Sequence, residues 1–108
     1  MPPKVRFSRE EIIAAALDIV REGGMTALTA RSLAARLGSS AKPVFGLFEN
    51  MQEVQTEVML AANTEYQSFL RTEMMRGIYK PYKASGMAYI AFARKEKELF
   101  KLLFMRDR

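Results

Sequence analysis

Two short apolar stretches separated by Gly38 constrain the fold of this chain more than any other feature of its sequence. Ala34, Gly38 and Val44 stand four and six residues apart. A helix-turn-helix needs a small residue where its helices meet, a left-handed residue in the tight turn, and a branched apolar residue that packs the second helix on the first. The spacing therefore predicts a helix-turn-helix, although a generic helical hairpin in a bundle has the same pattern.

The rest of the chain also has a helical pattern, because β-branched residues are sparse and no stretch alternates between apolar and polar residues. Ser8 and Glu11 have the spacing of a capping box, Thr29 is a second N-cap, and Ser39-Ser40 is a third cap signal. The predicted helices cover about residues 9–22, 30–37, 41–47, 51–76, 83–93 and 95–105. The predicted fold class is all-α.

Composition limits the function. The 108 residues suffice for one domain, or for a small head and part of a second unit. The net charge of +5 suits a nucleic-acid partner but is spread over both halves. Without cysteine or histidine, thiolate chemistry and the commonest general base and metal ligand are missing, so we expect no enzyme, metal or cofactor. With no long apolar run and no signal segment, a cytoplasmic protein without membrane contact is expected.

Several further elements follow one another in a fixed order. An apolar first helix precedes Glu22-Gly23, Leu28-Thr29, Leu33-Ala34-x-x-Leu37-Gly38 and Phe45-Gly46-Leu47-Phe48. With these elements, the stretch from residue 8 to 58 resembles the head of TetR-family transcription regulators. Residues 86–93 and 98–104 are similar to the opening of the regulatory domain in one subgroup of that family.

The resemblance implies a TetR-like three-helix DNA-binding head with its helix-turn-helix in residues 1–50. Residues 51–108 then hold the long connecting helix and the first helices of a ligand-binding and dimerisation domain. Because the sequence stops without a capping signal, we expect this domain to be truncated. The implied function is a ligand-responsive regulator, by family default a repressor. The resemblance further implies a homodimer in the full-length protein, a double-stranded DNA operator as partner and a small apolar effector.

Candidate DNA contacts lie at the start of the recognition helix and on nearby cations. Lys42 can reach a guanine edge or a phosphate, while a hydroxyl in the preceding serine pair either contacts phosphate or only caps the helix. Arg9 is expected to extend a basic N-terminal arm, and Arg36 to lie on or beside the supporting helix. The expected DNA-binding set is Lys4, Arg6, Thr29, Arg31, Ser39, Ser40, Ala41, Lys42 and Phe45.

Three positions depart from the family pattern. Many members have a tyrosine, a histidine and a lysine where this chain has Phe45, Leu47 and Met51. A phenolic hydroxyl and an ammonium group that commonly contact phosphates are therefore missing, which predicts weaker affinity for the DNA backbone. The same loss favours the alternative function, a helical protein-interaction module whose helix-turn-helix is only a scaffold.

Aromatic and methionine residues are frequent in the second half of the chain. Methionine adapts to irregular shapes, so such residues suit an apolar ligand pocket, while ordinary core packing is the commoner role for any one of them. The candidate pocket residues are Met59, Phe69, Met87, Tyr89, Phe92 and Phe104.

Overall fold

The computed structural model describes residues 7–105, and this range forms six α-helices, one short 3₁₀-helix and no strand. In chain order they are α1 (Arg9–Gly23), the 3₁₀-helix η1 (Met25–Ala27), α2 (Ala30–Leu37), α3 (Lys42–Leu47), α4 (Met51–Arg76), α5 (Pro81–Lys95) and α6 (Lys97–Phe104). The predicted all-α class is confirmed. Within the same range, no helix has the length and apolar character needed to cross a membrane.

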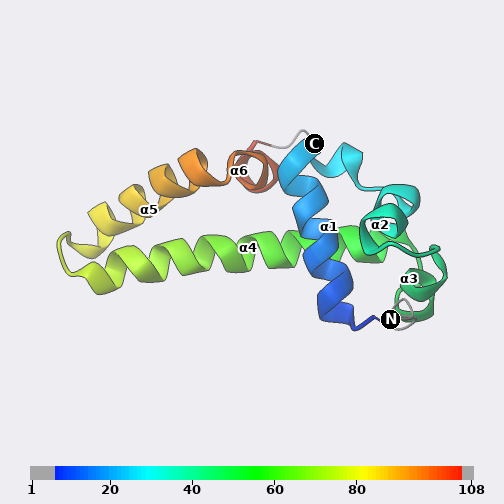
Figure 1. Ribbon diagram of the computed structural model, residues 1–108. Helices are drawn as coiled ribbons and strands as arrows, with labels where there is room; N and C mark the ends of the chain where they lie inside the picture. Colours follow the sequence, from blue (N-terminus) through cyan, green and yellow to red (C-terminus); the bar gives the residue numbers. More distant parts are fainter. Residues whose placement is uncertain (1–6, 106–108) are drawn as a thin grey trace.

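Helix α4 is the long axis of the molecule (Figure 1). Its 26 residues extend about 39 Å at 1.5 Å per residue. Helix α1 crosses its first half, α2 and α3 lie near its beginning, and α5 runs back along its second half to α6, which contacts α1 (Figure 1). The radius of gyration is 16.1 Å, above the roughly 13 Å of a compact domain of about 100 residues. The chain is elongated because the second half of α4 projects away from α1, α2 and α3.

Local capping sets the start of three helices. The Ser8 hydroxyl accepts a hydrogen bond from the Glu11 amide, and the Glu11 carboxylate accepts one from the Ser8 amide, both at 3.0 Å, so the predicted capping box is confirmed. Thr29 caps α2 in the same reciprocal way with Ser32. Asn50 caps α4 by accepting from the Glu53 amide at 2.9 Å.

The start of α3 differs from the prediction. Its N-cap is Ala41, whose backbone is already helical and whose side chain cannot cap. The Ser39 hydroxyl instead donates to the Ser40 carbonyl at 2.8 Å, and the Ser40 hydroxyl accepts a long 3.4 Å bond from the Lys42 amide. The prediction that the serine pair supplies the N-cap of this helix is therefore wrong. Pro43 lies in the first turn, where its missing N–H costs no helical hydrogen bond.

Two later helices also have different bounds. Helix α5 begins at Pro81 and not at Lys83, because a proline at the first helical position has the right φ and lacks only an N–H that would be unpaired anyway. The break between α5 and α6 falls at Glu96, two residues later than predicted, and η1 was not predicted at all.

The main core lies where α1 crosses α4. Helix α1 contributes an inward face at helical spacing, and α2, α3 and α4 each add apolar side chains to it. Val44 and Leu33 are both fully buried here, which agrees with the apolar positions expected of the two short helices. Fully buried side chains of this core include Ile12, Ala16, Val20, Leu33, Val44, Val54 and Val58.

A second group of apolar contacts joins α4, α5 and α6. Phe92 on α5 is fully buried, and its ring centroid lies 5.1 Å from that of Tyr66 and 5.3 Å from that of Phe69, both on α4. On α6, Phe100 and Phe104 continue this aromatic cluster, with centroids 5.0 and 5.1 Å from the Tyr89 ring. The tilted and edge-to-face geometry is the one that aromatic quadrupoles favour.

Gly38 ends α2 in the left-handed conformation, with φ 70° and ψ 32°. A Cβ added here would meet no atom within 4 Å, so only backbone strain opposes a side chain. We expect Gly38→Ala to lower the free energy of unfolding by about 1–2 kcal/mol, the cost of this conformation for an L-residue. Urea denaturation of the variant measures the loss.

Gly46 supplies a matched control for this substitution. It also has open space around an added Cβ, but it lies inside α3 without a positive φ. Gly46→Ala is expected to stabilise the protein by up to about 1 kcal/mol, because alanine has the higher helix propensity. Shifts of the same sign in the two variants would contradict the assigned role of Gly38.

Candidate nucleic-acid interface

Helix α3 has a buried inner face and an exposed outer face. Val44 and Phe48 point into the core, at 0% and 2% exposure. Lys42 and Phe45 are exposed and lie three residues apart on the opposite side, followed by Gly46. Because the inner face is fixed and the outer face has no cover in the described chain, α3 presents one short row of side chains to solvent.

Lys42 is the cation of this outer face. It is the first residue of α3, is exposed, and makes no ion pair within residues 7–105. Its ammonium group is therefore available to an anion, and it lies beside the backbone amides of the first helical turn. A positive side chain next to a helix start is a suitable arrangement for a phosphate or a base edge.

The two serines before α3 differ in what their hydroxyls can still do. Ser39 is half-buried and its O–H already donates to the Ser40 carbonyl. Ser40 is exposed, and its oxygen accepts from the Lys42 amide, so its own proton has no acceptor in the described part of the chain. Of the two predicted phosphate donors, only Ser40 has a free O–H. Ala41 beside them is half-buried and contributes its backbone.

Thr29 and Arg31 form a separate group at the start of α2. The Thr29 oxygen is used as a cap acceptor for the Ser32 amide at 3.0 Å, while its proton stays available. Arg31 is exposed and makes no ion pair among the described residues. The capped turn leaves the amides of residues 30 and 31 facing outward along the helix axis, which attracts an anion.

Arg36 belongs to a contact between helices. Its guanidinium donates to the Glu22 carboxylate at 2.5 Å and so joins α2 to the end of α1. This hydrogen bond holds the pKa of the Glu22 carboxyl below its ordinary value and raises the pKa of Arg36. Arg36 is consequently engaged with protein, unlike Arg31 on the same helix.

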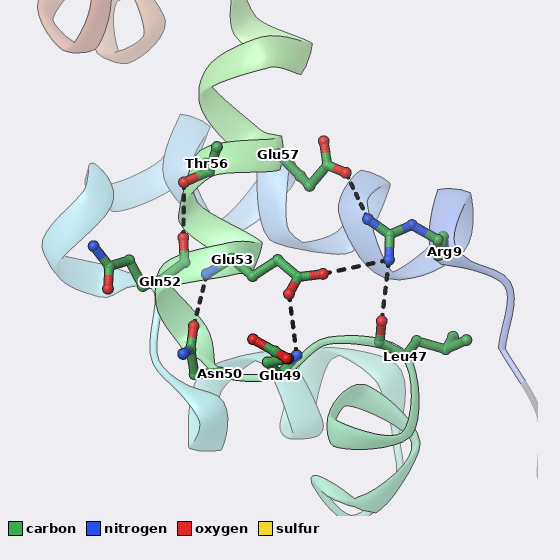
Figure 2. A network of polar contacts seen from close by, with 8 residues as sticks. All are labelled: Arg9, Leu47, Glu49, Asn50, Gln52, Glu53, Thr56 and Glu57. Atoms are coloured by element: carbon green, nitrogen blue, oxygen red, sulfur yellow. Dashed lines mark hydrogen bonds and ion pairs between the residues drawn. The ribbon is translucent and has the colours of Figure 1, made fainter.

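The Arg9 side chain contacts other parts of the protein and does not extend into solvent as predicted. Its guanidinium donates to the Leu47 carbonyl at 3.0 Å and to Glu57 at 2.6 Å, and it lies 3.5 Å from Glu53 (Figure 2). It also lies 4.4 Å from the centroid of the Phe48 ring. The prediction that Arg9 extends a free basic arm is wrong, because it ties the start of α1 to the end of α3 and to α4.

The hydrogen bond with Glu57 is the main reason that the pKa of Arg9 is raised. The acids that hold Arg9 are themselves part of the α3–α4 connection: Glu53 also accepts from the Glu49 amide at 3.3 Å, while its own amide is capped by Asn50 (Figure 2). The remaining members of the predicted arm, Lys4 and Arg6, lie outside the described residues.

The three positions that depart from the TetR pattern lie at different depths. Phe45 is 45% exposed and Leu47 is 40% exposed, so both present apolar surface. Met51 is half-buried and packs against the core at the start of α4. The outer face of α3 therefore combines one cation with two apolar side chains.

Four of the six candidate pocket residues pack against one another. Phe92 is buried in the aromatic cluster with Phe69 and Phe104, and Tyr89 packs on Phe104. Met59 and Met87 are half-buried. A cavity of about 310 Å³ does lie between α4 and α5, and Phe69 is the one candidate residue that lines it.

No group of three or more acidic residues in the described range has the geometry of a metal site. The polar features that stand out are thus the helix starts of α2 and α3 and the arginine contacts of α1. Compared with known proteins, the chain matches no family model, and neither a curated protein nor a solved structure matches it at a significant level.

Proposed function

We propose that this chain is the DNA-binding part of a transcription regulator, with α3 as the recognition helix in the major groove. The observation that carries the proposal is the outer face of α3, where Lys42 is exposed and makes no ion pair with any described residue, while Val44 and Phe48 anchor the helix from behind. A recognition helix needs such a fixed inner face and a free leading edge. The sequence resemblance to TetR-family heads supports the same function.

In this proposal Lys42, Phe45 and the Ser40 hydroxyl contact DNA from α3. Thr29 and Arg31 hold a phosphate at the start of α2, together with the outward amides of that turn. Phosphate contacts of this kind position the head, and Lys42 is the side chain placed to read a base. The further expectations from the family are a homodimer, repression of an operator, a response to a small molecule and a cytoplasmic location.

Salt dependence tests DNA binding directly. The chain is expected to bind duplex DNA with an affinity that falls steeply with salt, because each phosphate contact releases counterions. Lys42→Ala should weaken binding by roughly tenfold, and it should reduce the slope of log affinity against log salt by about one if Lys42 contacts a phosphate. Fluorescence anisotropy with labelled duplexes from a genomic-fragment selection measures both quantities.

Lys83→Ala is the matched control, since Lys83 is an exposed cation on α5 beside Tyr79, far from α3 in Figure 1. The DNA affinity of Lys83→Ala and the salt dependence of that affinity should equal those of the unmodified chain. Equal losses in both variants would mean that only the net charge matters, and unchanged binding of Lys42→Ala would remove α3 from the interface.

A second function is favoured by one observation. Phe45 and Leu47 together expose apolar surface on α3, which suits a helical protein-interaction module better than a phosphate backbone. The salt titration separates the two functions, because a module of this kind shows no salt-dependent affinity for duplex DNA.

A further inference from the structure

A cavity that is open to solvent lies between α4 and α5, outside the helices proposed to contact DNA. Its volume is about 310 Å³, which holds roughly ten water molecules at about 30 Å³ each and lies at the small end of the range for ligand sites. It is lined by Ser68, Phe69, Thr72, Glu73 and Arg76 from α4 and by Ala91 and Lys95 from α5. The wall thus combines apolar surface with hydroxyl and charged groups.

The one acid in this wall, Glu73, is already paired with a cation. Glu73 is 8% exposed, and both of its carboxylate oxygens accept from Nη1 of Arg76, at 2.9 and 3.1 Å. A carboxylate removed from water is costly unless it is paired, so this contact satisfies Glu73 and uses the charge of Arg76. Neither residue leaves a net charge at its end of the cavity.

Lys95 has no such partner. Its side chain is exposed and makes no ion pair within the described range, although it lines the cavity. Because α5 runs back along α4 from the loop at residues 77–80, Lys95 lies toward the Ser68 side of the cavity and Arg76 toward the loop side. The cavity therefore has a neutral end and an end with one uncompensated positive charge.

The hydroxyls of this wall are also free. Elsewhere on α4, Thr56 and Thr64 donate to the carbonyls four residues earlier at 3.0 Å, the usual contact for a hydroxyl within a helix. Ser68 and Thr72 line the cavity and make no hydrogen bond through their side chains in the described chain. Two O–H donors and one ammonium group accordingly face the same small volume.

We propose that this cavity binds a small organic anion, a carboxylate carried by a compact apolar body. The carboxylate lies between the Lys95 ammonium and the hydroxyls of Ser68 and Thr72, and the apolar body lies against Phe69 and Ala91. Hydrogen bonds to ionised groups are about twice as strong as neutral ones, so charge at this end decides which ligand binds. The expected effector thereby becomes an anionic molecule and not a purely apolar one. Ligand binding is independent of the proposed function, and only the regulatory role of the ligand rests on it.

Three probes of similar shape test the proposal by isothermal titration calorimetry on the whole chain without DNA. Phenylacetate is expected to bind at least about tenfold more tightly than phenylacetamide, its neutral counterpart, and 2-phenylethylamine is expected to bind least. Lys95→Met keeps the length of the side chain and removes its charge, so it should reduce phenylacetate affinity to that of the amide. Lys97→Met, at an exposed lysine outside the cavity wall, should leave phenylacetate binding unchanged.

Ala91→Leu places bulk in the cavity and should abolish binding of phenylacetate, while circular dichroism verifies that the helices are intact. Absence of saturable phenylacetate binding would overturn the proposal, as would equal affinity for acid and amide, preference for the amine, or an unaltered affinity in Lys95→Met. Since these titrations contain no DNA, their failure is distinguishable from a failure of DNA binding.

Discussion

Phe92→Ala is expected to lower the free energy of unfolding by about 3–5 kcal/mol, the range for removing a buried phenylalanine side chain. Phe92 is fully buried, and its ring contacts Tyr66 and Phe69 on α4. It also lies 6.4 Å from the Phe104 ring, so one side chain connects three helices. Urea denaturation followed by far-ultraviolet circular dichroism measures the loss.

Tyr82→Ala is the control for this variant. Tyr82 is an aromatic residue of the same helix but is 92% exposed, so its removal should change stability by no more than about 0.5 kcal/mol. A loss in Phe92→Ala below about 1 kcal/mol would mean that the aromatic cluster is loosely packed, as the wall of an open apolar pocket would be. The two variants therefore distinguish the packing role of Phe92 from the pocket role expected from the sequence.

Helix positions were predictable where local chemistry determines them. Ser8, Thr29 and Asn50 cap their helices with their own side chains, and Gly38 ends α2 because it alone accepts the left-handed conformation without strain. These signals act over three or four residues, so a sequence contains all of their information. Pro81 is ambiguous in the sequence, because a proline stops one helix and starts another equally well.

Contacts between distant segments were not predictable in the same way. Arg9 and Glu57 are 48 residues apart, and Arg21 donates to Glu96 across 75 residues at 3.1 Å. A charged residue on a helix surface has the same local pattern whether it meets solvent, DNA or an acid of another helix. Only the crossing of α1 over α4 and the return of α6 bring these acids to the arginines.

Some features of the candidate DNA contacts were predictable from the sequence and others were not. Lys42 could be placed from the sequence, because the start of a helix after a glycine turn is a local feature and the residue is exposed there. Which serine hydroxyl is free depends on backbone geometry at the turn, where Ser39 donates to a carbonyl and Ser40 does not. The cavity between α4 and α5 was not expected, since its charge balance depends on Glu73 and Lys95 from different helices.

Phe48, the residue that ends α3, gives the second large effect. Phe48 is 2% exposed and lies under the Arg9 guanidinium, at 4.4 Å from it. Phe48→Ala should cost about 3–5 kcal/mol of unfolding free energy, because it opens a cavity in the core and removes the ring on which Arg9 rests. Thermal unfolding and urea denaturation of the chain measure this loss, and a stable Phe48→Ala variant would contradict the anchoring of α3.

Phe45, three residues earlier, separates stability from binding. At 45% exposure its replacement by alanine should cost less than about 1 kcal/mol of stability. If α3 enters the major groove, Phe45→Ala should nevertheless weaken DNA binding by roughly fivefold, the equivalent of about 1 kcal/mol of lost contact. Because the fold is retained in this variant, a loss of DNA affinity cannot be attributed to misfolding. An unaltered DNA affinity would place the ring outside the DNA interface and favour a protein partner for the exposed apolar side chains of α3.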